Sequence, residues 1–98
     1  MTTLPLMLFR GGQVVATAAA CEVLSPMTMI DLLSRHMTGD WGELDPEDKA
    51  SNDKALLCDE RILSSYTTDN GIKVRIITEA DHSVTTILLP SDYRTKGG

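Results

Sequence analysis

The chain has 98 residues, a formal net charge of −5 and an apolar share of 42%. This length allows one domain with a single core, and this composition excludes a wholly disordered protein. The acidic balance argues against general affinity for nucleic-acid backbones, which requires clustered Lys and Arg. No stretch approaches the roughly 20 apolar residues of a membrane span, and the N-terminus lacks the features of a signal peptide. We expect a cytoplasmic protein with one domain over residues 1–93 and a flexible tail at 94–98.

The first third of the chain predicts a strand and two helices. Residues 6–9 and 13–17 are β-prone runs on either side of Arg10-Gly11-Gly12, which is typical of a small hairpin or a bent strand. Thr17 is suited to cap a short helix over 18–24. Ser25-Pro26 then starts a second helix, because a hydroxyl followed by proline is a common helix start.

That second helix is expected over 26–37, where apolar residues recur at spacings of three and four. Gly39 follows as a left-handed stop. A further helix is predicted from Asp45-Pro46 to about residue 57, with the Asp45 side chain accepting from the first free amides and Glu47 and Asp48 favouring the positive helix end.

The last third of the chain changes to strand periodicity. We predict strands over 61–67, 72–78 and 84–89, with a tight turn at Asn70-Gly71 and a stop at Pro90. The expected fold class is therefore α+β, with an N-terminal strand or hairpin and two to three helices packed on one face of a three-stranded antiparallel meander.

Acidic residues are concentrated in one segment. Residues 40–61 hold eight acids against Lys49, Lys54 and Arg61, a balance of −5, and the rest of the chain is neutral. Such a segment repels DNA and attracts a basic protein surface. We interpret this segment, with Trp41, as a partner-binding surface composed of Asp40, Trp41, Glu43, Asp45, Glu47, Asp48, Asp53, Asp59 and Glu60.

Trp41 itself has two interpretations. The favoured one is that its indole plugs the corner between helices and sheet, with its N–H on a carbonyl. The alternative is an exposed anchor for a partner, since tryptophan is frequent at binding hot spots. His36 lies four residues before Asp40, but Gly39 intervenes, so we expect His36 to pack at the last helical turn rather than bind a metal.

No reactive constellation emerges from the remaining candidates. Residues 79–83 combine two acids, His82 and a serine, but in a predicted turn, where such side chains satisfy the backbone. Cys21 and Cys58 lie far apart and form no C-x-x-C pair, so neither a zinc knuckle nor a redox pair is indicated. We expect both to be reduced and mostly buried. We expect no metal and no cofactor, because no phosphate, dinucleotide or calcium loop is present.

Several motifs in order along residues 13–93 resemble one family. They are Val14-Val15-Ala16-Thr17, Arg35-His36, Gly39-Asp40-Trp41-Gly42, Arg61-Ile62-Leu63-Ser64, Ile77-Thr78-Glu79-Ala80-Asp81, Ser83-Val84-Thr85-Thr86 and Leu88-Leu89-Pro90. The family consists of small bacterial proteins of plasmids and other mobile elements, labelled plasmid-related proteins or "type I restriction endonuclease subunit M". A methyltransferase subunit needs a cofactor-binding sheet that this chain cannot house. Similar sequences often have arginine at the position of His82, which argues against a catalytic role for His82.

What the resemblance implies is a setting in which small acidic proteins often inhibit restriction or CRISPR nucleases. The leading hypothesis is a non-enzymatic protein that contacts a basic host protein, such as a nuclease or CRISPR complex. The alternative is a nucleic-acid accessory or regulatory factor using Arg10, Lys73, Arg75 and Arg94. A third hypothesis is an enzyme using His36, His82, Glu79 and Asp81.

Overall fold

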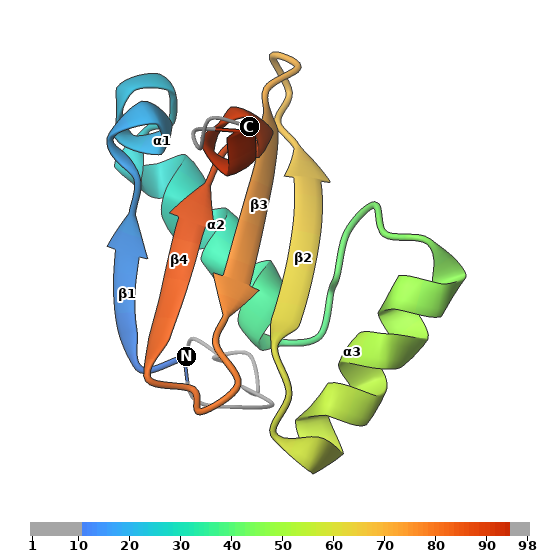
Figure 1. Ribbon diagram of the computed structural model, residues 1–98. Helices are drawn as coiled ribbons and strands as arrows, with labels where there is room; N and C mark the ends of the chain where they lie inside the picture. Colours follow the sequence, from blue (N-terminus) through green and yellow to red (C-terminus); the bar gives the residue numbers. More distant parts are fainter. Residues whose placement is uncertain (1–10, 95–98) are drawn as a thin grey trace, which may run out of the picture.

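A four-stranded sheet forms the centre of the protein in the computed structural model, which describes residues 11–94 (Figure 1). The strands are β1 (Gln13–Ala16), β2 (Ile62–Thr67), β3 (Lys73–Thr78) and β4 (Val84–Leu88). The helices are α1 (Ala18–Val23), α2 (Pro26–Met37), α3 (Pro46–Cys58) and the short 3-10 helix η1 (Pro90–Arg94). The predicted α+β class is confirmed. Within the described range, none of the helices combines the length and apolar character that crossing a bilayer requires.

The sheet has the strand order β1-β4-β3-β2. Strands β2, β3 and β4 form the predicted antiparallel meander, whereas β1 joins β4 in parallel, so the sheet is mixed. Helices begin directly after β1, and the chain therefore crosses a sheet face instead of turning back. The first half of the possible N-terminal hairpin, residues 6–9, lies outside the described residues.

The helix starts follow local capping chemistry. Thr17 Oγ1 accepts from the Ala20 N–H at 3.2 Å, and Ser25 Oγ accepts from the Thr28 N–H at 3.2 Å, with Pro26 at the first helical position. Gly39 has the expected left-handed backbone, with φ of 91°. Asp45 precedes α3 as predicted, but its side chain makes no capping hydrogen bond, so its expected acceptor role is wrong.

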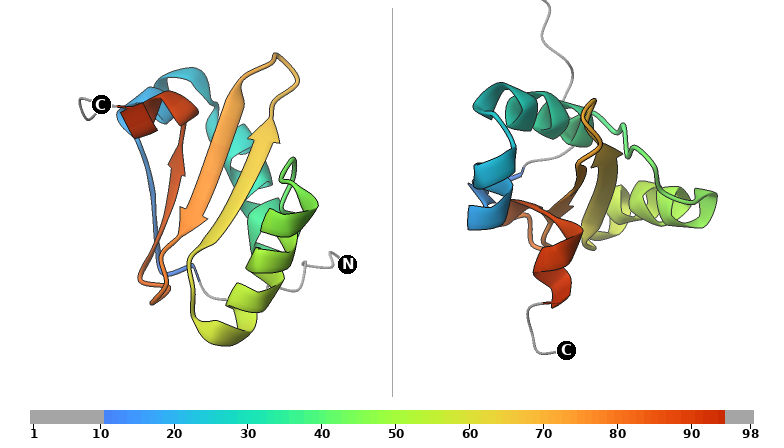
Figure 2. Two further views of the ribbon diagram at one scale, coloured as in Figure 1. Left: turned by 45° about the vertical axis from the view of Figure 1, so that its right-hand side comes forward. Right: turned by 90° about the horizontal axis from the view of Figure 1, so that it is seen from above.

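One face of the sheet packs on α2, and η1 lies on the opposite side (Figure 2). Strand alternation points Tyr66, Val74 and Ile76 toward α2, where they form a core with Leu24 and Leu32. A second cluster joins the end of α2 to α3. Its buried members are Met37, Trp41, Ala55 and Ile62.

The two cysteines are not buried. Cys21 and Cys58 are both free and exposed, so the predicted burial is wrong. The short helix α1 buries Ala20 and turns the neighbouring Cys21 outward. Cys58 ends α3, beyond the turn that Ala55 fixes against the sheet.

Candidate functional site

Helix α3 carries much of the acidic segment and lies beside the outer edge of β2 (Figure 1). Besides the packing of Ala55, one asparagine bonds the helix to the backbone of this edge. The Asn52 amide donates to the Leu63 carbonyl at 2.5 Å and accepts from the Leu63 N–H at 3.1 Å. The side chain thereby replaces one residue of a neighbouring strand. Sequence reasoning missed this role. The available signal was a polar residue in helical phase with the buried Ala55.

The segment before α3 closes the next part of the same edge. The Ser65 N–H donates to the Trp41 carbonyl at 3.1 Å, and the Glu43 N–H donates to the Ser65 carbonyl at 2.7 Å. Gly42 lies between them with φ of 76°, directly against the Ser65 backbone. The outer edge of β2 is therefore occupied from Leu63 to Ser65.

Trp41 is inside the molecule. Its side chain is 5% exposed and packs in the cluster between α2 and α3, as the favoured interpretation predicts. Its indole N–H donates to Asp53 Oδ1 at 3.1 Å rather than to a carbonyl. The assignment of Trp41 to the partner-binding surface is wrong, because a buried ring cannot anchor a partner.

The eight predicted acids are all exposed. They are Asp40, Glu43, Asp45, Glu47, Asp48, Asp53, Asp59 and Glu60. Among the described side chains, ion pairs within 4.0 Å join Arg35 to Asp40 and Arg61 to Glu79. In that part of the chain, only Asp40 of the eight acids has a cationic partner at this distance.

Asp40 is compensated by α2. Its carboxylate accepts from Arg35 Nε at 2.7 Å, and this hydrogen bond lowers the pKa of Asp40 and raises the pKa of Arg35. The guanidinium also lies 4.6 Å from the centroid of the Tyr66 ring. Asp40 is therefore part of the corner that positions α3 and contributes little net negative charge.

Six of the seven remaining acids lie at the two ends of α3. Glu43, Asp45, Glu47 and Asp48 lie at its start, and Asp59 and Glu60 follow its last turn. We call these six residues the α3 acidic surface. Its two parts are separated by about 20 Å, the length of a helix of 13 residues. Asp53 lies between them and accepts from the indole of Trp41. Within the surface, Glu43 Oε1 accepts from Thr67 Oγ1 at 2.9 Å.

His36 lies in the core rather than in a site. Its ring is fully buried, with Nδ1 2.5 Å from Ser64 Oγ and Nε2 2.9 Å from Thr78 Oγ1. Packing at the last turn of α2 is confirmed, but the partners are hydroxyls of the sheet instead of free helix carbonyls. Burial lowers the pKa of His36 to about 4, so the imidazole is neutral at pH 7.

The direction of the hydrogen bonds around His36 follows from their last acceptor. Thr85 donates to the Gly11 carbonyl at 2.7 Å, so the Thr78 hydroxyl must donate to Thr85 Oγ1, 2.7 Å away. His36 Nε2 then carries the proton toward Thr78, and Nδ1 accepts from Ser64. This series of hydrogen bonds crosses β2, β3 and β4 on the face of the sheet that packs on α2.

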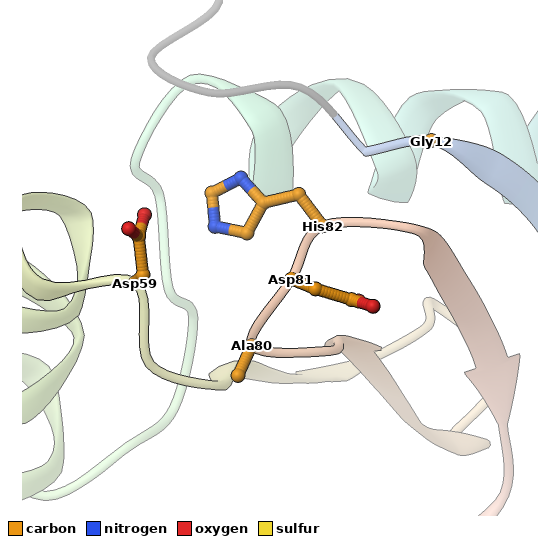
Figure 3. Close-up of a pocket in the computed structure, with 5 residues that line it drawn as sticks. All are labelled: Gly12, Asp59, Ala80, Asp81 and His82. Atoms are coloured by element: carbon orange, nitrogen blue, oxygen red, sulfur yellow. The ribbon is translucent and has the colours of Figure 1, made fainter.

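The other histidine lines a separate hollow. His82 turns the chain between β3 and β4 with φ of 58°, and its N–H donates to the Glu79 carbonyl at 2.8 Å, which confirms the turn. A hollow of about 720 Å³ is lined by Gly12, Asp59, Ala80, Asp81 and His82. In Figure 3 the His82 ring faces Asp59, and the Asp81 carboxylate points away from both. The two imidazoles do not converge.

Of the four residues proposed for nucleic-acid contact, the structure describes the side chains of two. Lys73 is exposed and Arg75 half-buried, and both lie on the sheet face opposite α2. Arg10 and the Arg94 side chain lie outside the described residues. No group of three or more His, Cys, Asp or Glu side chains within the described range is placed to hold a metal ion.

No protein-family model, curated protein or solved structure matches this chain. These comparisons therefore add no support for the family resemblance of the sequence, and the structural evidence for function is the geometry of the acidic segment.

Proposed function

We propose that this is a non-enzymatic binding protein of a mobile genetic element that inhibits host defence through protein–protein contact. The α3 acidic surface is its contact with a basic partner, a restriction or CRISPR nuclease complex. The observation that carries the proposal is that six exposed acids gather at the ends of one helix without a cation of the described side chains within 4.0 Å.

The energetics of such a surface favour recognition over stability. Exposed carboxylates without an ion-pair partner add little to folding, and like charges at close spacing oppose it. The same charges steer a basic partner and speed its encounter, most strongly in low salt. The hydrogen bonds of Asn52 hold α3 at the sheet edge, so both groups of acids keep their spacing when a partner approaches.

The attachment of α3 also leaves the helix accessible. Its buried residues are Asn52 and Ala55, and Leu57 on its outer side is 86% exposed. A partner can therefore contact the outer side of α3 and both of its ends without displacing core residues. An apolar residue between two acidic groups is a common arrangement for a contact that combines packing with charge.

Association with purified restriction and CRISPR nuclease complexes, each free of DNA, tests the proposal. We expect binding to at least one complex that weakens steeply with salt, together with relief of interference when the protein is expressed in cells. Absence of both would overturn it. An electrophoretic shift of DNA in low salt would instead favour the nucleic-acid alternative through Lys73 and Arg75.

A further inference from the structure

Strand β1 is the other edge of the sheet, and among the described residues no element lies beyond it (Figure 1). Its parallel pairing with β4 uses the backbone groups of Gln13 and Val15, as the bond from the Gln13 N–H to the Ser83 carbonyl at 3.0 Å shows. The N–H and C=O groups of Val14 and Ala16 alternate with these and point outward. Such an edge is a template for another strand.

An apolar groove accompanies this edge. It has a volume of about 270 Å³ and lies between β1 and α2. Its described lining contains no charged side chain and consists of Val14, Val15, Ala16, Pro26, Met29, Ile30, Leu33 and Ile87. Val14 is 45% exposed and Ile30 61% exposed, so residues 11–94 leave apolar surface uncovered beside the outward backbone groups of β1.

We infer that β1 pairs antiparallel with β1 of a second copy of this chain, which joins the two sheets into one and makes the protein a symmetric dimer. The inference goes beyond the proposed function and does not rest on it. It places the backbone N–H and C=O groups of Val14 and Ala16 at the interface.

The spacing of the outward residues is self-complementary. With the two-fold axis at Val15, Val14 of each copy lies opposite Ala16 of the other, and both are residues whose backbone groups point outward. Each such pair exchanges two hydrogen bonds, and the two Val15 side chains meet at the close, non-hydrogen-bonded position. The symmetric pairing thus satisfies every outward backbone group of Val14 and Ala16.

The distribution of charge limits the repulsion between two copies at this edge. Each chain carries −5, and the acidic segment lies beside β2, at the opposite end of the strand order from β1. Two copies that meet through β1 therefore keep their acidic surfaces at the far ends of the joined sheet. Residues 13–17 contain no charge that opposes the approach.

Sedimentation of the full chain from about 5 to about 500 µM tests the inference, because a dimer is favoured by concentration. We expect the mass to double across this range. Val14→Pro removes an outward N–H but leaves the pairing with β4, and Val15→Lys places two like charges at the axis. Each is expected to raise the dissociation constant about 10-fold or more. Leu57→Lys makes the same charge change on α3 and should leave the dimer unchanged.

A monomeric wild-type protein throughout the range would overturn the inference and would leave the edge to a strand of another protein or to none. Dimers of both β1 variants as tight as the wild type, or loss of the dimer only in Leu57→Lys, would also overturn it. Amide exchange of the wild-type protein needs no variant. The Val14 and Ala16 amides should exchange more slowly as concentration rises, and equal rates at both ends of the range would contradict the dimer.

Discussion

The two edges of the sheet differ in whether other described residues pair with their outward backbone groups. At β2, Asn52 and the backbone of Trp41 and Glu43 occupy the groups that a further strand would use. At β1, the described residues leave the outward groups of Val14 and Ala16 uncovered beside an apolar groove. The closed edge carries the acids and the open edge carries none. One small sheet thus presents acidic side chains at one edge and outward-pointing backbone groups at the other.

The largest loss of stability is expected at Gly42, where the backbone before α3 lies directly against Ser65 of the β2 edge. Gly42→Ala should destabilise the protein by about 4 kcal/mol, because the new Cβ would overlap the Ser65 carbonyl oxygen and the position has positive φ. Gly71→Ala is the matched control, since φ is also positive but nothing lies within 4 Å. It should cost about 1 kcal/mol. Urea denaturation measures both, and equal losses would contradict the account of this edge.

The next effect concerns the hydrogen-bond chain that links the two edges. His36 connects Ser64 on β2, through Thr78 and Thr85, to Gly11 just before β1. Its pKa is lowered to about 4 from 6.5, so below pH 6.5 the unfolded chain takes up a proton that the folded protein excludes. The contribution of His36 to the free energy of unfolding should be fully present above pH 6.5 and should fall by about 3 kcal/mol as the pH drops to about 4.

Urea denaturation at a series of pH values measures this loss. His36→Gln, which keeps a donor and an acceptor, should be less stable at pH 7 but should lose the contribution of His36 to the slope between pH 6.5 and 4. His82→Gln leaves His36 in place and should keep that contribution. An unchanged slope in His36→Gln would show that another group produces it.

The attachment of α3 comes third. Asn52→Ala should cost about 2 kcal/mol, because the partly buried Leu63 N–H and carbonyl both lose the buried Asn52 side chain as their partner. Ser51→Ala, at the exposed neighbouring position, should change stability by less than about 0.5 kcal/mol. Thermal unfolding compares the two variants. Similar midpoints would indicate that packing of Ala55, rather than Asn52, fixes the helix.

The smallest effect is expected at the corner before α3. Arg35 and Asp40 are both substantially exposed, so their ion pair should contribute less than about 1 kcal/mol. A double-mutant cycle of Arg35→Gln and Asp40→Asn measures the coupling directly. A coupling well above this value would make the pair a structural element of the closed edge.

Much of the fold follows from local sequence signals. The hydroxyl caps at Thr17 and Ser25 define the starts of α1 and α2, and alternation defines the three meander strands. The parallel placement of β1 is a tertiary property, since a short β-prone run carries no sign of its partner. The buried partners of His36 were likewise hidden, because Ser64, Thr78 and Thr85 look like ordinary polar strand residues.

The candidate site was predictable in part. The count of charges along the sequence predicted an acidic segment, and all eight of its acids are exposed, while their role in binding stays a prediction. The compensation of Asp40 by Arg35 and the burial of Trp41 depend on how the chain folds around Gly39 and Gly42. Such a corner brings residues together by backbone geometry, which residue type and spacing do not encode.

We propose that recognition resides in the α3 acidic surface and not in net charge, and two matched triple variants separate these possibilities. Glu47→Gln/Asp48→Asn/Glu60→Gln neutralises exposed acids of this surface, and Glu22→Gln/Asp31→Asn/Asp69→Asn neutralises exposed acids elsewhere. The measurement is the dissociation constant from the nuclease complex that binds the wild-type protein. We predict that the first variant binds about 10-fold more weakly and the second within about 2-fold of wild type. Equal weakening by both variants, or by neither, would contradict the claim.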